Sequence, residues 1–313
     1  MITVVFRVCI WTFRLEPYQR HKGAQNRIAN STSDIVSDAF DLSFNLRGIG
    51  WSWSQGLCVP EETRDVTSTP SFLLSTLQWF LQSFVAFDFC YYGVQWFSPD
   101  TIGSPKGGSI YDPALHPLTR YTCSTLITLL GGLTIYLAID AMYNFVTLLG
   151  IIVFRQSPTQ WPPVSNRPYC ATSLNQFWTI RWHQALRHIF IGCGSKPLMY
   201  LAGKVGGVIG AFLISGLLHD LGCWGMGRGT DFKRISGFFV MNAVGMILEH
   251  VYKSITGKRV EGLLGWIWTV TWLLGWGGML IDAWMIRGLA GSTFVPPYLR
   301  PAAIVLGPLS RRQ

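Results

Sequence analysis

Apolar runs long enough to cross a bilayer alternate with short polar segments along most of the chain. Residues 72–97 are mostly apolar and aromatic, residues 122–154 carry Asp140 as their one charge, and residues 263–281 carry none. About 20 helical residues cover a hydrocarbon core of ~30 Å, so each run predicts a membrane-spanning helix. Residues 122–154 fit either one long tilted or kinked span or a span followed by a shorter, partly buried segment.

A further run, at residues 199–222, ends on polar residues. It has no ionisable side chain from Val205 to Leu218, after which His219 and Asp220 follow directly. Holding an ionisable pair in or near hydrocarbon costs free energy, so a functional role is the default interpretation. The alternative is a histidine at the membrane interface that hydrogen-bonds a neighbouring helix. Small residues that would let another helix approach closely gather in this run: Gly203, Gly206, Gly207, Gly210 and Ala211.

A polar segment precedes this run. Residues 173–190 read SLNQFWTIRWHQALRHIF, and Ser173 with Gln176 forms a capping-box pattern that predicts a helix start. Continued as one helix, the segment has an apolar face formed by Leu174, Trp178, Trp182, Ala185 and Ile189. The opposite face carries Gln176, Thr179, His183 and Arg187. Such a helix either lies on the membrane surface or lines an active-site tunnel, where an anionic ligand would meet Arg181, Arg187 and Lys196.

The N-terminal part differs from the apolar runs by its charge. We expect residues 1–70 to form a basic N-terminal segment, residues 71–295 a membrane-embedded domain and residues 296–313 a C-terminal tail. Residues 47–51 read RGIGW, and their glycines and tryptophan predict a turn leading into an amphipathic anchor at the membrane surface. Residues 155–196 hold five basic residues and no acid, which indicates a cytosolic loop.

The composition is typical of a membrane protein. Of the 313 residues, 49% are hydrophobic and 13% charged, against about a quarter charged in a soluble domain. The 14 tryptophans suit the aromatic belts at membrane interfaces. A net charge of +9 fits cytosolic loops and anionic headgroups, so we expect membrane lipids and no nucleic acid among the partners. The seven cysteines lie singly, which favours neither a disulfide framework nor a zinc site, and we expect no metal.

Two motifs together carry a resemblance to a known family. The pattern FW-x-x-RWHQ at residues 177–184, with SGLLHD at residues 215–220, resembles the wax synthase-like branch of the membrane-bound O-acyltransferases. RGIGW and the tryptophan-rich last span resemble the fungal members of that branch, and the resemblance covers about residues 42–295. It implies an all-α, multi-pass integral membrane bundle with interfacial helices and an internal tunnel, which we expect in the endoplasmic reticulum. Members of the branch usually carry further membrane helices before RGIGW, so we expect the N-terminus to be either short or incomplete.

The resemblance also implies an activity and a site. The activity is transfer of an acyl group from acyl-CoA to the hydroxyl of a lipophilic alcohol. His219 matches the family's invariant histidine, and His183 its second polar position, where relatives often carry asparagine. Substrate or CoA binding is expected of Trp178, Arg181, Trp182, Gln184 and Arg187. No bound cofactor is expected, because acyl-CoA is a co-substrate. Acetyl-CoA with a terpenoid or meroterpenoid alcohol is the expected pair, and a long-chain fatty alcohol that yields a wax ester is the alternative.

The residue types fit this chemistry independently. An alcohol is a poor nucleophile near neutral pH, so its attack on a thioester benefits from a positioned base, most often histidine. No serine or cysteine has a nucleophile-elbow context in the sequence, which favours direct transfer over a covalent acyl-enzyme.

Intramembrane acids motivate two rival hypotheses. Such acids pair with polar or basic partners between helices or carry protons and substrate; here they are Asp88, Asp140, Glu249 and Asp282. A transporter or channel would use them as a pathway, but the sequence lacks paired broken helices in two matching halves. An integral-membrane terpene cyclase would use one acid to protonate an epoxide or alkene, without needing CoA or the two motifs. The sequence indicates no oligomeric state.

Overall fold

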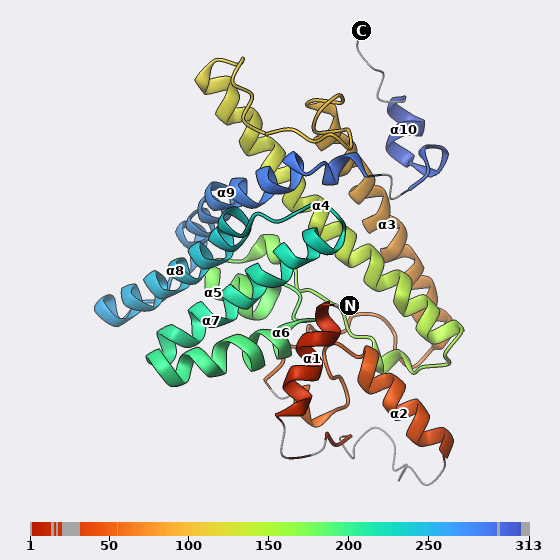
Figure 1. The fold of residues 1–313 in the computed structure, drawn as a ribbon. Helices are drawn as coiled ribbons and strands as arrows, with labels where there is room; N and C mark the ends of the chain where they lie inside the picture. Colours follow the sequence, from red (N-terminus) through yellow and green to blue (C-terminus); the bar gives the residue numbers. More distant parts are fainter. Residues whose placement is uncertain are drawn as a thin grey trace.

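The backbone folds into helices. The structure, a computed structural model, describes residues 2–13, 16, 18–20, 32–54, 56–292 and 295–307. Its long helices are α3 (Thr69–Trp96), α4 (Pro117–Ile152), α7 (Lys196–Gly225), α8 (Phe232–Thr256) and α9 (Gly262–Ile286) (Figure 1). Its short helices include α1 (Ile2–Thr12), α2 (Thr32–Phe44), α5 (Leu174–Gln176), α6 (Arg187–Ile189) and α10 (Pro301–Leu306). Within these described ranges the one β pairing is an isolated bridge between Arg20 and Trp51. The predicted all-α fold is confirmed.

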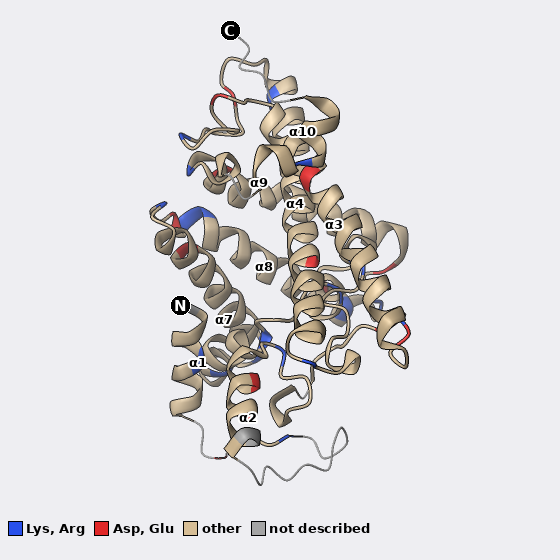
Figure 2. Cartoon of the chain, turned by 90° about the vertical axis from the view of Figure 1, so that its right-hand side faces the viewer, with Lys and Arg blue, Asp and Glu red and all other residues tan. Residues whose placement is uncertain are grey.

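Four helical stretches of the described chain are long and apolar enough to cross a membrane: α4, Arg187–Gly225, α8 and α9. Charged residues are sparse along the helices (Figure 2). The chain is therefore an integral membrane protein, as predicted. Residues 122–152 belong to one helix, α4, rather than to two segments. The run at 72–97 is helical as α3, but it is not among the four, since glutamines and Asp88 interrupt its apolar sequence.

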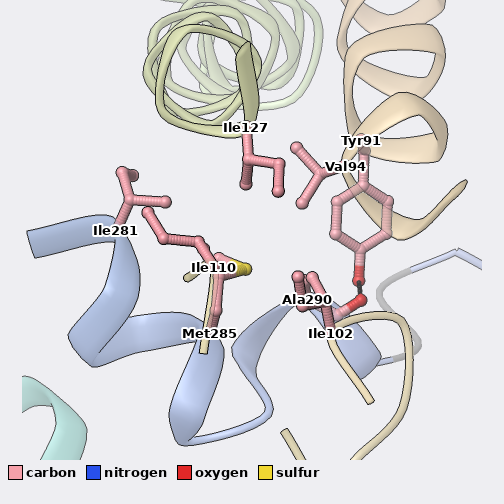
Figure 3. Close-up of a cluster of buried hydrophobic side chains, with 8 residues drawn as sticks. All are labelled: Tyr91, Val94, Ile102, Ile110, Ile127, Ile281, Met285 and Ala290. Atoms are coloured by element: carbon pink, nitrogen blue, oxygen red, sulfur yellow. Dashed lines mark hydrogen bonds between the residues drawn. The ribbon is translucent and has the colours of Figure 1, made fainter. Parts of the chain in front are cut away.

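Helices α3, α4 and α9 meet at a hydrophobic cluster. Tyr91 of α3 and Ile127 of α4 pack in it with Ile281 and Met285 of α9 (Figure 3). The Tyr91 hydroxyl also donates a hydrogen bond to the carbonyl of Ala290 at 2.7 Å. Burying a large apolar side chain stabilises a fold by about 1.5–3 kcal/mol, so this cluster joins α9 firmly to the α3–α4 pair.

The intramembrane acids have protein partners, as the pairing interpretation predicted. Asp88 of α3 accepts a hydrogen bond from the Arg300 guanidinium at 2.6 Å, which ties the segment before α10 to α3. Asp282 of α9 forms an ion pair with Arg234 of α8 at 3.2 Å. Asp140 of α4 accepts a hydrogen bond from a serine hydroxyl of α3 at 2.5 Å. A buried charge without a partner would cost several kcal/mol, so these contacts hold neighbouring helices in register.

The stretch Arg187–Gly225 is a helical hairpin. Ala202 and Gly203 leave the helical region, with Gly203 at φ +62°, and the chain turns back there (Figure 1). A Cβ on Gly194 would lie 2.2 Å from the carbonyl oxygen of Gly210, so the two legs touch through their backbones. A side chain at either glycine would separate the legs. The close packing predicted from the small residues of this run is confirmed.

The RGIGW stretch buries its arginine and its tryptophan against other parts of the protein, and its role as a membrane-surface anchor stays a prediction. Arg47 and Trp51 are only 8% and 5% exposed. The Arg47 guanidinium donates to the carbonyls of Pro162 and Pro163 at 2.7 Å, and the Trp51 indole donates to Asp41 at 2.7 Å. These acceptors compensate the burial of both groups. The predicted turn is present, because both glycines of the motif have positive φ, +67° and +84°.

The first helix, α1, packs against the hairpin. Ile10 lies over Gly192 of the first leg, where a Cβ would approach its Cδ1 to 2.9 Å. Arg7 of α1 donates to the carbonyl of Ser43 at 2.9 Å, near the end of α2. These contacts join the N-terminal segment to the membrane-embedded helices, and the division into three domains stays a prediction.

Candidate active site

Residues 173–190 do not form the single amphipathic helix predicted for them. The helix starts as predicted, because the Ser173 hydroxyl accepts a hydrogen bond from the backbone amide of Gln176 at 3.0 Å and caps α5. The chain then widens into a π-helical turn, Phe177–Arg181, and becomes extended at Trp182, with φ −73° and ψ 158°. The two predicted faces therefore do not continue to residue 190.

This helix ends because groups outside it satisfy its last carbonyl oxygens. The Gln184 side-chain amide donates to the carbonyl of Thr179, and the backbone amide of Asn166 donates to that of Arg181 at 2.8 Å. Helical periodicity in the sequence cannot reveal partners of this kind. As a result, His183 lies in an irregular segment between the π-helical turn and α6.

His219 lies in the second leg of the hairpin, one turn after Ser215. Its Nδ1 is 2.7 Å from the Ser215 carbonyl oxygen. A carbonyl oxygen can only accept, so Nδ1 carries the proton and Nε2 is left to accept another. The imidazole centroid lies 4.6 Å from the ring of Phe239 on α8 and 6.3 Å from that of Trp284 on α9. The His219 imidazole is thus held in one orientation by the backbone and by aromatic rings.

His183 is the second histidine of the site. Its Nδ1 is buried and has no hydrogen-bond partner in the described chain. Burial, with smaller contributions from nearby His219 and Arg47, lowers the pKa of His183 to about 4. Burial disfavours the charged form, and neighbouring positive charge adds to the effect. The ring is therefore neutral near pH 7, and its buried Nδ1 lacks a partner in the described chain.

A row of aromatic contacts joins the two histidines. The ring of Trp182 lies 5.2 Å from that of His183 and 6.1 Å from that of Trp178. Trp178 in turn lies 6.2 Å from Phe239, which packs against His219 at 4.6 Å. The motifs around residues 183 and 219 thus meet at one site lined by aromatic side chains. They are more than 30 residues apart in the sequence.

Three of the other predicted site residues have partners within the protein. The Trp178 indole donates to the Asn242 side chain at 3.0 Å. The Gln184 carbonyl oxygen accepts from the backbone amide of Cys58 at 3.1 Å, and the Arg181 guanidinium donates to a backbone carbonyl of the preceding loop at 3.2 Å. These polar groups support the shape of the site, and a direct contact with substrate stays a prediction.

Arg187 differs from them. Within the described chain no carboxylate lies at ion-pair distance from its guanidinium. A Cβ placed on Gly56, which has φ +75°, would lie 3.2 Å from Nη2 of Arg187. The guanidinium therefore lies beside a glycine turn of the N-terminal segment, with hydrogen-bond donors to spare for an anionic group.

Several residues of the site were not identified as site residues from the sequence. Phe239 and Asn242 reach it from α8, and Arg47 from the RGIGW segment, because the tertiary fold brings these elements together. Ser215 is the exception, since it precedes His219 by one helical turn within the same motif. In the described chain, no group of three or more histidine, cysteine, aspartate or glutamate side chains is placed to hold a metal ion.

Comparison with known proteins identifies the relatives of this chain. Residues 161–241, which include both histidines, match the membrane bound O-acyl transferase family. The chain is 22% identical over 308 residues to acetyltransferase spyB of Aspergillus fumigatus, an alignment that covers 87% of this chain and 51% of that protein. It is 24% identical over 184 residues to acetyltransferase fsoF of Humicola fuscoatra, covering 51% and 43%.

The chain is also similar to a plant protein. The identity is 28% over 158 residues to the probable long-chain-alcohol O-fatty-acyltransferase 3 of Arabidopsis thaliana, covering 46% of this chain and 44% of that protein. The chain spans about half the length of these relatives. The resemblance seen in the sequence is confirmed: this integral membrane protein is similar to the membrane bound O-acyl transferase family over residues 161–241, and to a plant long-chain-alcohol acyltransferase and two fungal acetyltransferases over longer stretches.

Proposed function

We propose that the protein is an acyl-CoA-dependent O-acyltransferase that esterifies the hydroxyl of a lipophilic alcohol within the membrane, with His219 as general base. The observation that carries this proposal is the 2.7 Å contact between His219 Nδ1 and the Ser215 carbonyl oxygen. The contact orients the ring and leaves Nε2 as the proton acceptor. A base positioned in this way contributes roughly 10²–10⁴-fold to a reaction rate.

The proposed reaction needs only the two substrates. Nε2 of His219 accepts the hydroxyl proton of the alcohol while the alcohol oxygen bonds to the thioester carbonyl carbon. The tetrahedral intermediate then collapses, the carbon–sulfur bond breaks, and the proton passes from the imidazolium to the CoA sulfur. The products are an ester and free CoA, and His219 returns to its starting state.

Two further residues take part in the proposed site. In the tautomer that carries a proton on Nδ1, His183 donates to the thioester carbonyl oxygen and stabilises the negative charge that develops there. Arg187 binds a phosphate group of CoA, because its guanidinium has no carboxylate partner in the described chain. Trp178 and Trp182 form an apolar wall that keeps water from the reacting thioester.

For the substrates we propose acetyl-CoA and a terpenoid alcohol. The fungal relative that aligns with 87% of this chain is named an acetyltransferase, and so is the second fungal relative. A long-chain fatty alcohol with a longer acyl-CoA is the second candidate, because the plant relative is named for that reaction. Location in the endoplasmic reticulum and exposure of residues 155–198 to the cytosol stay predictions.

The rival hypotheses have less support. Asp88 and Asp282 pair with arginines, and Glu249 accepts three N–H donors. A pathway for transported protons or ions, and an acid that protonates a terpene, both need carboxyl groups that are free to change partners. These three carboxylates are instead engaged in holding helices together.

Proteoliposomes that contain the purified chain test the proposed function. They are incubated with labelled acetyl-CoA or palmitoyl-CoA and a panel of terpenoid and long-chain alcohols. We expect labelled ester from the wild type, none above background from His219→Ala, and wild-type amounts from His116→Ala, which replaces an exposed histidine. Absence of ester with every pair of substrates, from protein with a single cooperative thermal transition, would contradict the proposal. Preference for palmitoyl-CoA would select the second candidate.

A further inference from the structure

Helix α8 presents three residues on one face to the segment that leads to His183. Asn242, Gly245 and Glu249 are three and four residues apart, a spacing that lines one face of a helix. Asn242 and Glu249 are 0% and 8% exposed. Neither side chain takes part in the proposed chemistry. Burying a polar side chain in a membrane-spanning helix costs free energy, so both need another physical explanation.

Glu249 holds the start of the segment. Its carboxylate oxygens accept hydrogen bonds from the backbone amides of Leu174, at 2.6 Å, and Asn175, at 3.0 Å. These are the first amides of α5, which have no acceptor inside the helix. The Trp268 indole donates a third bond at 3.0 Å. No basic side chain of the described chain forms an ion pair with Glu249, so N–H donors alone compensate its burial.

Gly245 and Asn242 hold the following residues. A Cβ on Gly245 would lie 2.4 Å from Cδ1 of Leu174, whose side chain is fully buried, so the leucine packs directly on the helix backbone. Oδ1 of Asn242 accepts from the Trp178 indole at 3.0 Å, and Nδ2 donates to the carbonyl of Phe238 at 2.9 Å. Trp178 cannot move away without leaving a buried acceptor unpaired, which costs about 1–3 kcal/mol.

We propose that Glu249 and Asn242 are positioning residues that fix residues 174–178 on α8 and thereby set the place of His183 relative to His219. Helix α8 is a common frame for both histidines, because Phe239 on the same helix packs against His219. The catalytic consequence rests on the proposed acyl transfer, whereas the positioning itself does not. A displacement of about 1 Å in an active site can cost roughly 100-fold in rate.

Hydrogen exchange of the full-length protein in nanodiscs tests the positioning without any substrate. Peptides that cover residues 172–182 report the amides of Leu174 and Asn175. We expect them to exchange at least tenfold faster in Glu249→Gln, because the amide group that replaces one carboxylate oxygen cannot accept from a backbone N–H. Trp268→Phe removes only the third donor and should keep the slow exchange. Glu261→Gln, an exposed glutamate before α9, is the matched control.

Kinetics with the same samples test the catalytic consequence. Glu249→Gln should lower kcat roughly 10- to 100-fold while the KM for acyl-CoA stays within about twofold, because the reacting groups are displaced and the CoA-binding arginine is not. Asn242→Leu, close in size but unable to accept from Trp178, provides a second variant. The double variant with Trp178→Phe should lower kcat no more than the more severe single variant, since both substitutions remove the same hydrogen bond.

The outcomes are distinguishable. Unchanged exchange at residues 172–182 in Glu249→Gln would overturn the positioning. Faster exchange with unchanged kcat in Glu249→Gln, or additive losses in the double variant, would overturn its catalytic consequence. If Glu249→Gln exchanges faster in every helix, it has lost its fold, and Asn242→Leu decides. An inactive wild type with slow exchange at these amides would refute the proposed function and leave the positioning in place.

Discussion

The carbonyl oxygen of Ser215 lies 2.7 Å from Nδ1 of His219, one helical turn further along the same leg of the hairpin. The carbonyl belongs to the backbone, so no substitution of the serine side chain removes this acceptor. It determines which ring nitrogen carries the proton, as a carboxylate or carbonyl does for other functional histidines. The neighbouring carboxylate of Asp220 does not serve this purpose, because it accepts from the backbone amide of Asp231 at 2.6 Å.

His219→Ala is expected to lower kcat roughly 10²–10⁴-fold, the usual contribution of a positioned base. The KM for acyl-CoA should change little, because proton transfer belongs to the transition state. Steady-state kinetics with equal amounts of membrane-inserted wild type, His219→Ala and His116→Ala provide the measurement. Near-normal turnover in His219→Ala would remove this residue from the mechanism.

His183→Asn should retain more activity than His183→Ala. The asparagine amide still offers a donor toward the thioester carbonyl, whereas alanine leaves none. We expect a loss of about tenfold for asparagine and a further tenfold for alanine, in line with about 1.5–3 kcal/mol for a hydrogen bond to a charged group. The measurement is kcat/KM for acyl-CoA at a saturating concentration of the alcohol. Equal loss in the two variants would mean that the hydrogen bond of His183 does not contribute.

His183 should also make the folded protein sensitive to acid. Its pKa of about 4 lies below the ordinary value of about 6.5, so between these values the unfolded chain binds a proton that the folded chain does not. Above pH 6.5 His183 is neutral in both states and does not lower the free energy of unfolding. As the pH falls toward 4 the free energy of unfolding decreases, by on the order of 2 kcal/mol at pH 5.

The measurement is the thermal transition in detergent at pH 7 and pH 5. His183→Asn should show a smaller decrease in Tm on acidification than the wild type, and His116→Asn should behave like the wild type. The same decrease in all three proteins would show that other groups cause the acid sensitivity.

Arg187→Ala should raise the KM for acyl-CoA roughly tenfold with little change in kcat, because the proposed phosphate contact would be the same in ground and transition states. Lys204→Ala, which removes an exposed cation of the hairpin, controls for the general effect of positive charge. Initial rates against acyl-CoA concentration at low and high salt provide the test. A similar increase in both variants would assign the effect to surface charge rather than to Arg187.

Gly210→Val should destabilise the hairpin. A Cβ at this position would lie 2.3 Å from the carbonyl oxygen of Gly194, and backbone atoms there cannot move aside cheaply. Overpacking of this kind costs about 1–3 kcal/mol or more, so the Tm in detergent should fall by several degrees. Gly222→Val on the same helix is the control, since a Cβ there meets nothing within 4 Å. An equal decrease in Tm for the two variants would mean that the helix propensity of valine, rather than contact between the legs, causes the loss of stability.

The sequence by itself determined the class of fold and singled out two candidate site residues. Uncharged runs of about 20 residues can satisfy their backbone groups in hydrocarbon only as helices, so the helical membrane fold followed from composition and length. His219 and His183 were identified because ionisable groups beside such runs are costly, and because the two motifs that contain them resemble one family. The pairing of Asp88 and Asp282 was predictable for the same energetic reason.

Only the tertiary structure decided how the site is assembled. Residues 173–190 have a good helical period, yet they break after Arg181 because Gln184 and Asn166 satisfy the carbonyl oxygens that the helix would have used. The RGIGW pattern predicts an amphipathic surface segment, but its arginine and tryptophan are buried and find hydrogen-bond acceptors on other elements. Periodicity records only which side chains share a face, whereas these outcomes depend on hydrogen-bond partners that are distant in sequence and become neighbours only when the helices pack.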